Sequence, residues 1–481
     1  MGIRINEISP TYPWGFSQNN HGGGDTPSPD PPIPPTPPRP DPPTPTTRKI
    51  YSIHIDQSNS DPSAAITYGD DAVGMQPAHM VFDAETPYFD YGSWENAFFM
   101  PKPCMLNYDG TVAYYLNPND YTKKVDGTDA DTSATAGLNA MMEWPLIWYK
   151  FSGGDSESDG YFYVSNEQVD ETYHCWCNLD YLGEITPHFY TSIYTCTNPA
   201  TVKTEKRLRS LSGCSLVSNS SQTGETSRFG YRTMTEELSM VNRLSVGGSS
   251  APEWYPDVYC DRMLINALLL LISKTRDSIS AFGFGMALDP STYRYPYSTG
   301  RWNTKGLFYG ASTSCDVVKV FGMENWYGGP IRRIYGAYRT SSGFIVKLTY
   351  STADGSTVEG YKDDATTREG MLVVGSMPAT PQSMNLIVSE NYTEYGFYPY
   401  VIEPITEVVD WQHKYWSSVY NNVGNGSVFA TYPQAYFESP ETDPYNGRFG
   451  QGLFACTLAD TSRQSTITTG ISCKPLASRF S

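Results

Sequence analysis

The sequence lacks any apolar run long enough to cross a membrane. A membrane-spanning helix needs about 20 predominantly apolar residues, whereas the longest apolar stretch here covers only residues 263–272, which indicates a core helix. The first eight residues contain no basic segment that leads into an apolar run, so they predict no signal peptide. We therefore expect a chain that is made in a cytoplasm, does not insert into a membrane and does not leave by the secretory route.

Positive charge is scarce. The chain has 33 lysine and arginine residues against 51 aspartate and glutamate residues, which gives a net charge of −18. The densest basic cluster covers residues 203–209. Binding to a phosphate backbone needs many converging cations. We therefore expect this cluster to be a solvated loop, and we expect nucleic acid not to be a partner.

Cysteines are few and scattered. The nine cysteines include no Cys-x-x-Cys pair, and only Cys175 and Cys177 lie close together in the sequence. A structural zinc site needs four converging ligands, which two such pairs usually supply. The pattern favours reduced and mostly buried thiols over a metal site, and it predicts neither a metal nor another cofactor.

Familiar catalytic motifs are missing as well. The sequence contains no phosphate-binding G-x-x-x-x-G-K-[ST] loop, no H-E-x-x-H and no G-x-S-x-G. His174, His188 and His413 are far apart, so each is predicted to be a packed or surface residue. The acidic segment 354–369 could supply oxygen ligands for calcium, but it lacks the EF-hand spacing, and a solvated loop is favoured. We expect no enzymatic activity.

Proline is abundant in one place. Twelve prolines fall among the nineteen residues 27–45, and such a tract favours extended polyproline II at about 3.1 Å per residue. We interpret residues 26–47 as a stiff linker. Residues 1–25 carry Trp14 and Phe16, enough apolar side chain to dock into another protein. They are predicted to be an anchor, with a disordered tail as the alternative.

The remaining chain favours strands over helices. Aromatic residues make up 14% of the chain and charged residues only 17%. Alternating apolar and polar residues predict a strand over residues 49–56. Turn residues or Gly/Ser/Asp loops beside β-prone segments predict further strands over 111–116, 146–151, 160–165, 344–350 and 371–375. Apolar residues at helical spacing predict two helices, over residues 234–246 and 257–275, the second with Asp257 as its N-cap. The expected fold class is therefore β-rich α+β with two main helices.

The most specific motif is Gly-Met-Glu-Asn-Trp-Tyr-Gly at residues 322–328. Gly322 and Gly328 permit positive φ and close backbone approach. Glu324 and Asn325 can satisfy backbone groups of a loop, and Trp326 supplies a large apolar plug. We interpret the motif as structural: it should hold a long loop against the core.

This motif resembles the glycine, acid, asparagine and aromatic signature of C-type-lectin-like domains in the formylglycine-generating-enzyme branch, which phage tail-fibre and receptor-binding proteins use widely. Further segments are similar to phage proteins in the same order along the chain, namely 60–74, 102–124, 142–150, 208–213, 304–308 and 470–476. The resemblance implies an N-terminal β-rich region over residues 48–137 and a lectin-like receptor-binding domain over 138–481.

The resemblance does not bring catalysis or calcium-dependent sugar binding with it. Formylglycine-generating enzymes use a close pair of cysteines late in the domain, whereas Cys456 and Cys473 are well separated here. The calcium signatures of sugar-binding C-type lectins are also missing, since Glu403-Pro404-Ile405 departs from the Glu-Pro-Asn signature at its last residue.

In the resembled fold, the long loops before the last strands form an exposed face. Here that segment is rich in aromatic residues among small polar ones, a mixture that suits recognition of sugars or proteins. The candidate ligand-binding residues are Tyr398, Tyr400, Trp411, Tyr415, Trp416, Tyr420, Tyr432, Tyr436 and Tyr445. The alternative is that these side chains belong to a core or a subunit interface.

Together these features predict a phage fibre or spike protein of the virion. Residues 1–25 would bind other virion proteins, and the head would bind a bacterial surface polysaccharide or protein. The resemblance also implies a homotrimer. The alternatives are a virion-borne enzyme that degrades glycans and a purely structural connector, and the sequence leaves a tail or head location open.

Overall fold

The computed structural model describes one compact unit of the chain. The chain divides into two units, Met1–Thr44 and Pro45–Ser481, and all described residues lie in the second. The described residues are 47–56, 58–154, 159–196, 207–214, 233–245, 253–283, 298–312, 318–327, 331–340, 343–346, 372–375, 384–393, 396–404, 418–421, 428–431, 456–459 and 467–480. The predicted anchor, with Trp14 and Phe16, and all but the last residue of the predicted linker lie outside them.

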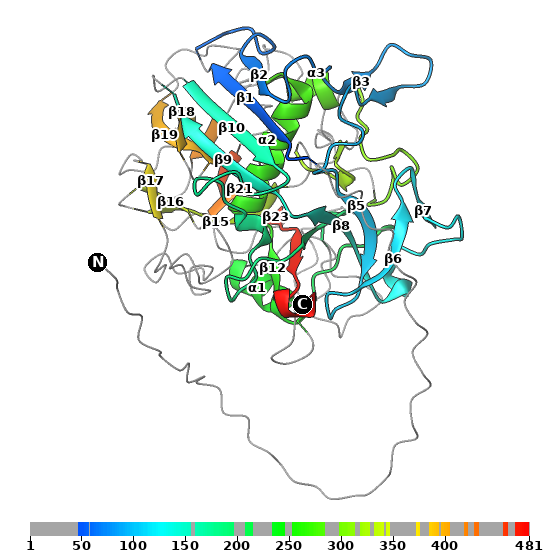
Figure 1. The fold of residues 1–481 in the computed structure, drawn as a ribbon. Helices are drawn as coiled ribbons and strands as arrows, with labels where there is room; N and C mark the ends of the chain where they lie inside the picture. Colours follow the sequence, from blue (N-terminus) through cyan, green and yellow to red (C-terminus); the bar gives the residue numbers. More distant parts are fainter. Residues whose placement is uncertain are drawn as a thin grey trace, which may run out of the picture. The chain divides into compact units, whose positions relative to one another are not determined.

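A four-stranded antiparallel sheet lies at the upper front of Figure 1. Its strands, in spatial order, are β2 (Ile66–Asp70), β1 (Ile50–Asp56), β10 (Asp159–Ser165) and β9 (Trp148–Gly153). Side chains alternate between its faces. Ile53, Ile55, Phe162 and Val164 are fully buried on one face, and the residues between them are partly exposed on the other. The predicted strands 49–56, 146–151 and 160–165 are confirmed within a few residues.

A seven-stranded sheet joins early, middle and late parts of the chain. In spatial order its strands are β12 (Glu253–Pro256), β24 (Ile471–Lys474), β11 (His188–Ser192), β8 (Asn139–Pro145), β5 (Lys102–Leu106), β6 (Val112–Asn117) and β7 (Asp120–Lys124). The boundary expected between residues 137 and 138 runs through this sheet, because β5 pairs with β8. Described strands from both sides of this boundary therefore share one hydrogen-bonded sheet.

A nine-stranded sheet holds most of the later strands. Along its main path lie β17 (Leu372–Gly375), β16 (Gly343–Val346), β15 (Ile331–Thr340), β21 (Val428–Thr431), β22 (Cys456–Ala459), β20 (Ser418–Asn421), β18 (Met384–Thr393) and β19 (Gly396–Pro404), while β23 (Ile467–Thr468) pairs with β15. Two further two-stranded sheets pair β3 (His79–Val81) with β4 (Tyr88–Asp90), and β13 (Lys319–Val320) with β14 (Met323–Glu324).

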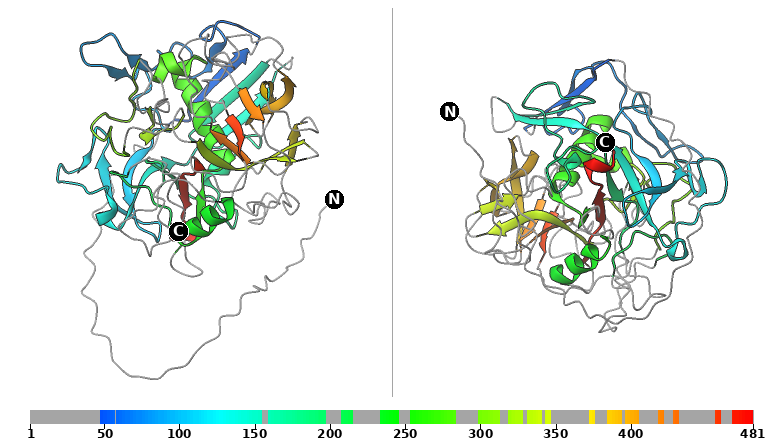
Figure 2. Two further views of the ribbon diagram at one scale, coloured as in Figure 1. Left: turned by 180° about the vertical axis from the view of Figure 1, so that it is seen from behind. Right: turned by 60° about the horizontal axis from the view of Figure 1, so that its bottom comes forward.

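Three α-helices occur among the described residues: α1 (Met234–Asn242), α2 (Tyr259–Ser273) and α3 (Ser278–Phe282). A capping box begins α1, in which Thr233 and Glu236 exchange side-chain to backbone hydrogen bonds. Every residue of α2 is buried. In Figure 1, α2 lies behind the four-stranded sheet. It also packs against β15, and the left view of Figure 2 shows the molecule from this rear side. The apolar run 263–272 is therefore a core helix, as predicted.

Three expectations differ from the structure. Asp257 does not cap α2, because Val258 holds the N-cap position and the Asp257 carboxylate forms an ion pair with Arg332. The short helix α3 was not predicted. Arg209 is not part of a solvated loop: it is 2% exposed, and its guanidinium donates to the Leu138 carbonyl at 2.8 Å.

The β-rich fold class with few helices is confirmed. Within the described part of the chain, no α-helix has both the length and the apolarity to cross a bilayer.

Candidate functional site

The motif at residues 322–328 lies in the core as far as Tyr327, and Gly328 lies outside the described residues. Gly322 has a φ of 80°, and a Cβ at this position would lie 2.3 Å from the Tyr121 hydroxyl, so only glycine fits. Glu324 is fully buried and accepts hydrogen bonds from the backbone N–H groups of Gly300 (2.8 Å) and Trp302 (3.1 Å). Glu324 thus holds the loop that contains residues 300–302.

Asn325 and Trp326 connect the same motif to its surroundings. Asn325 has a φ of 58°, a left-handed conformation that asparagine tolerates. Its backbone N–H donates to the Val318 carbonyl at 2.8 Å. The Trp326 indole donates to Asn266 Oδ1 of α2 at 2.8 Å. The motif therefore fastens a loop to both α2 and the segment before β13.

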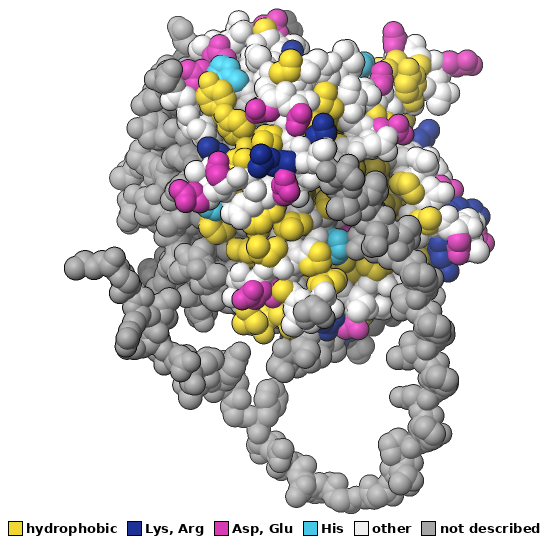
Figure 3. All heavy atoms as spheres, in the orientation of Figure 1, with side chains coloured by type: hydrophobic (Ala, Val, Ile, Leu, Met, Phe, Trp, Pro, Cys, Tyr) yellow, Lys and Arg dark blue, Asp and Glu magenta, His cyan; other side chains and the backbone are white. Residues whose placement is uncertain are grey.

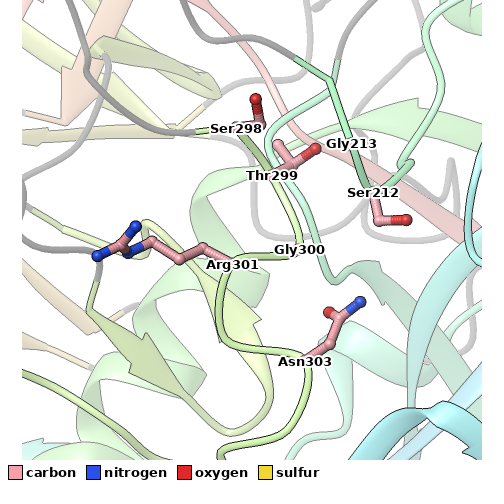
Figure 4. A pocket seen from close by; sticks show the side chains of 7 residues that line it. All are labelled: Ser212, Gly213, Ser298, Thr299, Gly300, Arg301 and Asn303. Carbon is pink, nitrogen blue, oxygen red and sulfur yellow. The ribbon is translucent and has the colours of Figure 1, made fainter.

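The loop that Glu324 holds forms one wall of an open hollow of about 440 Å³ (Figure 4). Its lining residues are Ser212, Gly213, Ser298, Thr299, Gly300, Arg301 and Asn303. The two walls are paired, since the Gly213 N–H donates to the Thr299 carbonyl at 2.8 Å. Asn303 Oδ1 accepts a hydrogen bond from the Tyr194 hydroxyl at 2.5 Å, and this bond fixes the orientation of the Asn303 side-chain amide. Figure 4 shows the Arg301 guanidinium pointing away from Ser212 and Asn303.

The lining is therefore hydroxyl, amide and guanidinium, and none of these described lining residues is a carboxylate. Such groups donate hydrogen bonds to hydroxyl or carboxylate oxygens of a ligand. They offer no pair of acids for general acid–base hydrolysis of a glycosidic bond. The hollow is thus suited to binding a polar ligand.

A buried lysine contacts the loop that forms this wall of the hollow. Lys319 pairs with Glu324 across the β13–β14 ladder, and its Nζ donates to the Trp302 carbonyl at 3.0 Å and lies 3.7 Å from the centre of the Tyr121 ring. Burial lowers the pKa of Lys319 to about 7, although the negative charges of Glu324 and Asp120 act in the opposite direction. The neutral amine is therefore favoured in the folded protein at alkaline pH.

This burial makes stability depend on pH. The pKa of Lys319 is about 7 in the folded chain and 10.5 when it is unperturbed, so the unfolded chain binds more protons between these values. The unfolding free energy should therefore rise with pH across this window, by at most about 1.4 kcal/mol per pH unit from this group. Below pH 7 the buried amine is charged in the folded chain, so the full cost of burying this charge lowers the stability there. Urea unfolding at several pH values should show a flatter dependence for Lys319→Met than for the wild type, and parallel curves would contradict the prediction.

A second polar and aromatic surface lies on the exposed face of the four-stranded sheet. The rings of His54 and Tyr161 are 4.7 Å apart, and those of Tyr161 and Tyr163 are 6.2 Å apart and nearly parallel. The Lys150 ammonium lies 5.6 Å from the centre of the Tyr163 ring, and His54 contacts Asp159 at 2.9 Å. We call His54, Tyr161, Tyr163 and Lys150 the aromatic row. Figure 3 views this side of the molecule, where hydrophobic side chains lie between charged ones.

Strand geometry explains the aromatic row. Tyr161 and Tyr163 are two residues apart on β10, so they share a face, and the register places His54 opposite Tyr161 and Lys150 opposite Tyr163. All four side chains are half-buried. The strand is predicted from the sequence, but these residues were not among the predicted site residues. The Tyr-Phe-Tyr alternation at residues 161–163 was the signal that could have identified them.

The structure brings together part of the predicted set of residues. Gly322, Glu324, Asn325 and Trp326 form one buried group. Tyr398 and Tyr400 lie on β19, and Tyr420 lies on β20, where Tyr398 is in register with Asn391 and Tyr420 with Asn385. The other predicted ligand-binding residues lie outside the described part of the chain, namely Trp411, Tyr415, Trp416, Tyr432, Tyr436 and Tyr445. The acidic segment 354–369 lies outside it as well.

No family model matches this chain, and no curated protein or solved structure matches it either. The lectin-like identity of the fold therefore stays a prediction from the sequence motifs.

Proposed function

We propose that this chain is a phage virion fibre or spike protein that binds a bacterial surface polysaccharide or protein. Residues 1–25 attach it to other virion proteins, residues 26–47 form the stiff spacer, and the compact unit after the spacer is a lectin-like head. The head is not an enzyme, and a homotrimer presents several weak sites at once, which increases avidity. The division of the chain between Thr44 and Pro45, at the end of the proline tract, is consistent with a spacer followed by a head.

The aromatic row is the observation that carries the binding role. Stacked rings offer flat apolar faces, and Lys150, His54 and Asp159 provide polar partners at their edges. Sugar rings present the complementary combination of apolar faces and hydroxyl edges, and aromatic side chains give a large contact area at low entropic cost. A polysaccharide is therefore the favoured ligand of this face.

Binding of the purified full-length chain to a panel of candidate host cells tests the proposal. The chain should bind one of these hosts and compete with infecting particles. Tyr161→Ala and Tyr163→Ala should each weaken binding roughly fivefold, because loss of one stacked ring removes about 1 kcal/mol. Tyr88→Ala is the matched control, since Tyr88 is a 54% exposed aromatic residue on β4, away from the aromatic row. Absence of both cell binding and competition would refute the head's role.

The anchor is tested separately. A fusion of residues 1–47 to a fluorescent protein should be incorporated into virions, whereas a fusion that carries Trp14→Ala and Phe16→Ala should be incorporated less. If the fusion is incorporated but the full-length chain binds no host, the connector alternative is favoured. If the chain shortens surface polysaccharides, the enzyme alternative is favoured.

A further inference from the structure

Two cysteines and an aspartate from distant parts of the chain meet in the core. Cys177 lies in the short 3-10 helix η2 (Trp176–Asn178), and Cys260 and Asp261 lie in the first turn of α2. The two Sγ atoms and a carboxylate oxygen lie within 4.8 Å of one another. Cys177 is fully buried, and Cys260 and Asp261 are only 5% and 3% exposed. Three potential metal ligands thus share one water-excluded space.

Two tyrosine hydroxyls complete the surroundings of this cluster. The Tyr149 hydroxyl lies 3.5 Å from Cys177 Sγ, and the Tyr255 hydroxyl donates to Asp261 Oδ2 at 3.0 Å. Cys260 Sγ contacts Asp261 Oδ1 at 3.4 Å. Burial raises the pKa of Asp261 and of the Cys177 thiol. Both oxygens of the Asp261 carboxyl group therefore accept hydrogen bonds, one from Tyr255 and one from Cys260.

The charges of the cluster match a divalent cation. Two thiolates and one carboxylate carry three negative charges, so a divalent cation leaves a net charge of −1. Lys474 of β24 is 1% exposed and lies beside the cluster, since its Nζ is 3.3 Å from the Trp176 carbonyl and 5.2 Å from the centre of the Tyr255 ring. Its positive charge also lowers the pKa of Asp261, against the effect of burial. A loaded site would therefore be neutral together with Lys474, which removes most of the electrostatic penalty of burial.

We propose that Cys177, Cys260 and Asp261 bind a thiophilic divalent cation of the Zn²⁺ class. Two sulfur ligands and one oxygen ligand suit Zn²⁺, with distances of about 2.3 Å to sulfur and about 2.0–2.2 Å to oxygen. Such distances require the ligand atoms, now within 4.8 Å of one another, to approach by up to roughly 1 Å. The Tyr149 hydroxyl, 3.5 Å from Cys177 Sγ, would supply the fourth ligand. Because the space is buried, the site is structural, and it joins η2 to the start of α2.

Metal analysis of the unaltered full-length chain is the first test. The chain, produced with zinc in the medium and washed with a mild chelator, should retain about one Zn²⁺ per chain. Refolding with Co²⁺ instead should give the visible spectrum of tetrahedral cobalt and a thiolate-to-cobalt charge-transfer band. These two measurements need no variant, so they do not depend on how well a variant folds.

Variants then assign the ligands. Cys177→Ser and Cys260→Ser should each lose the charge-transfer band or halve it and should release zinc to the chelator. Cys104→Ser is the control, because Cys104 is equally buried on β5 but is not a member of the cluster. A wild-type chain without zinc and without the cobalt band overturns the proposal. A charge-transfer band that is unchanged in both Cys177→Ser and Cys260→Ser also overturns it. The same holds for a disulfide between Cys177 and Cys260 in the purified chain. None of these outcomes bears on host binding.

Discussion

Arg333→Met is expected to lower the free energy of unfolding by about 3–5 kcal/mol. Arg333 of β15 forms an ion pair with Glu237 of α1 at 2.8 Å, and both side chains are fully buried. The substitution leaves the Glu237 carboxylate in the core without its cation, where water cannot replace it. The Tyr335 hydroxyl still donates to Glu237 at 2.7 Å, but one neutral donor does not balance a buried charge. Urea unfolding followed by circular dichroism measures the loss.

Two further variants show whether the lost charge pairing is the cause. Arg333→Met combined with Glu237→Leu should regain most of the stability, because apolar replacement of both partners removes the unpaired charge. Lys123→Met is the exposed control: Lys123 and Asp129 approach to 2.5 Å, but their side chains are 42% and 89% exposed, so no measurable loss is expected. If the double variant is as unstable as Arg333→Met, loss of packing rather than loss of charge pairing is responsible.

Local sequence patterns predicted the regular elements well. Strand β1 alternates apolar and polar residues, and β9 and β10 are largely aromatic and apolar segments that flank a Gly/Ser/Asp loop. Each of these patterns depends only on neighbours along the chain. The apolar run of α2 also predicted a buried helix, because a helix that is apolar all round has to lie in a core. The start of α2 was less predictable. Asp257 looked like an N-cap, but a buried arginine competes for its carboxylate.

Contacts between distant segments could not be predicted in this way. The sequence shows Arg332 and Arg333 side by side, and strand alternation sends them to opposite faces. Nothing local indicates that their partners are Asp257 and Glu237. The burial of Arg209 was missed for the same reason, since the carbonyl that it binds belongs to Leu138, far upstream.

The candidate site was predicted in part. The motif from Gly322 to Trp326 was recognised because glycine, acid, amide and indole have distinct roles in holding a loop. The hollow whose wall Glu324 holds was not recognised, because its walls come from residues 212–213 and 298–303 and meet only in the folded chain. The aromatic row depends on the register of three strands, and the sequence alone does not give that register.

Trp326 is the other residue at which a large effect is expected, because it joins the motif to the central helix. Its ring is 3% exposed and lies 4.2 Å from the Arg262 guanidinium, while its indole N–H donates to Asn266 at 2.8 Å. Arg262 and Asn266 are four residues apart on α2, so they present one helix face to the ring. The Arg262 guanidinium also donates to the Trp326 carbonyl. One side chain thus combines packing, a hydrogen bond and a cation–π contact.

Trp326→Ala should therefore lower the unfolding free energy by about 3–5 kcal/mol, the range for truncation of a large buried aromatic residue. Trp326→Phe keeps most of the ring but loses the donor to Asn266, so a smaller loss of about 1–3 kcal/mol is expected. Thermal and urea unfolding measure both. Because the motif also fixes the wall of the hollow through Glu324, Trp326→Ala should expose the backbone N–H groups of Gly300 and Trp302 to faster hydrogen exchange. If exchange at these two positions stays as slow as in the wild type, Trp326 stabilises α2 without positioning the loop.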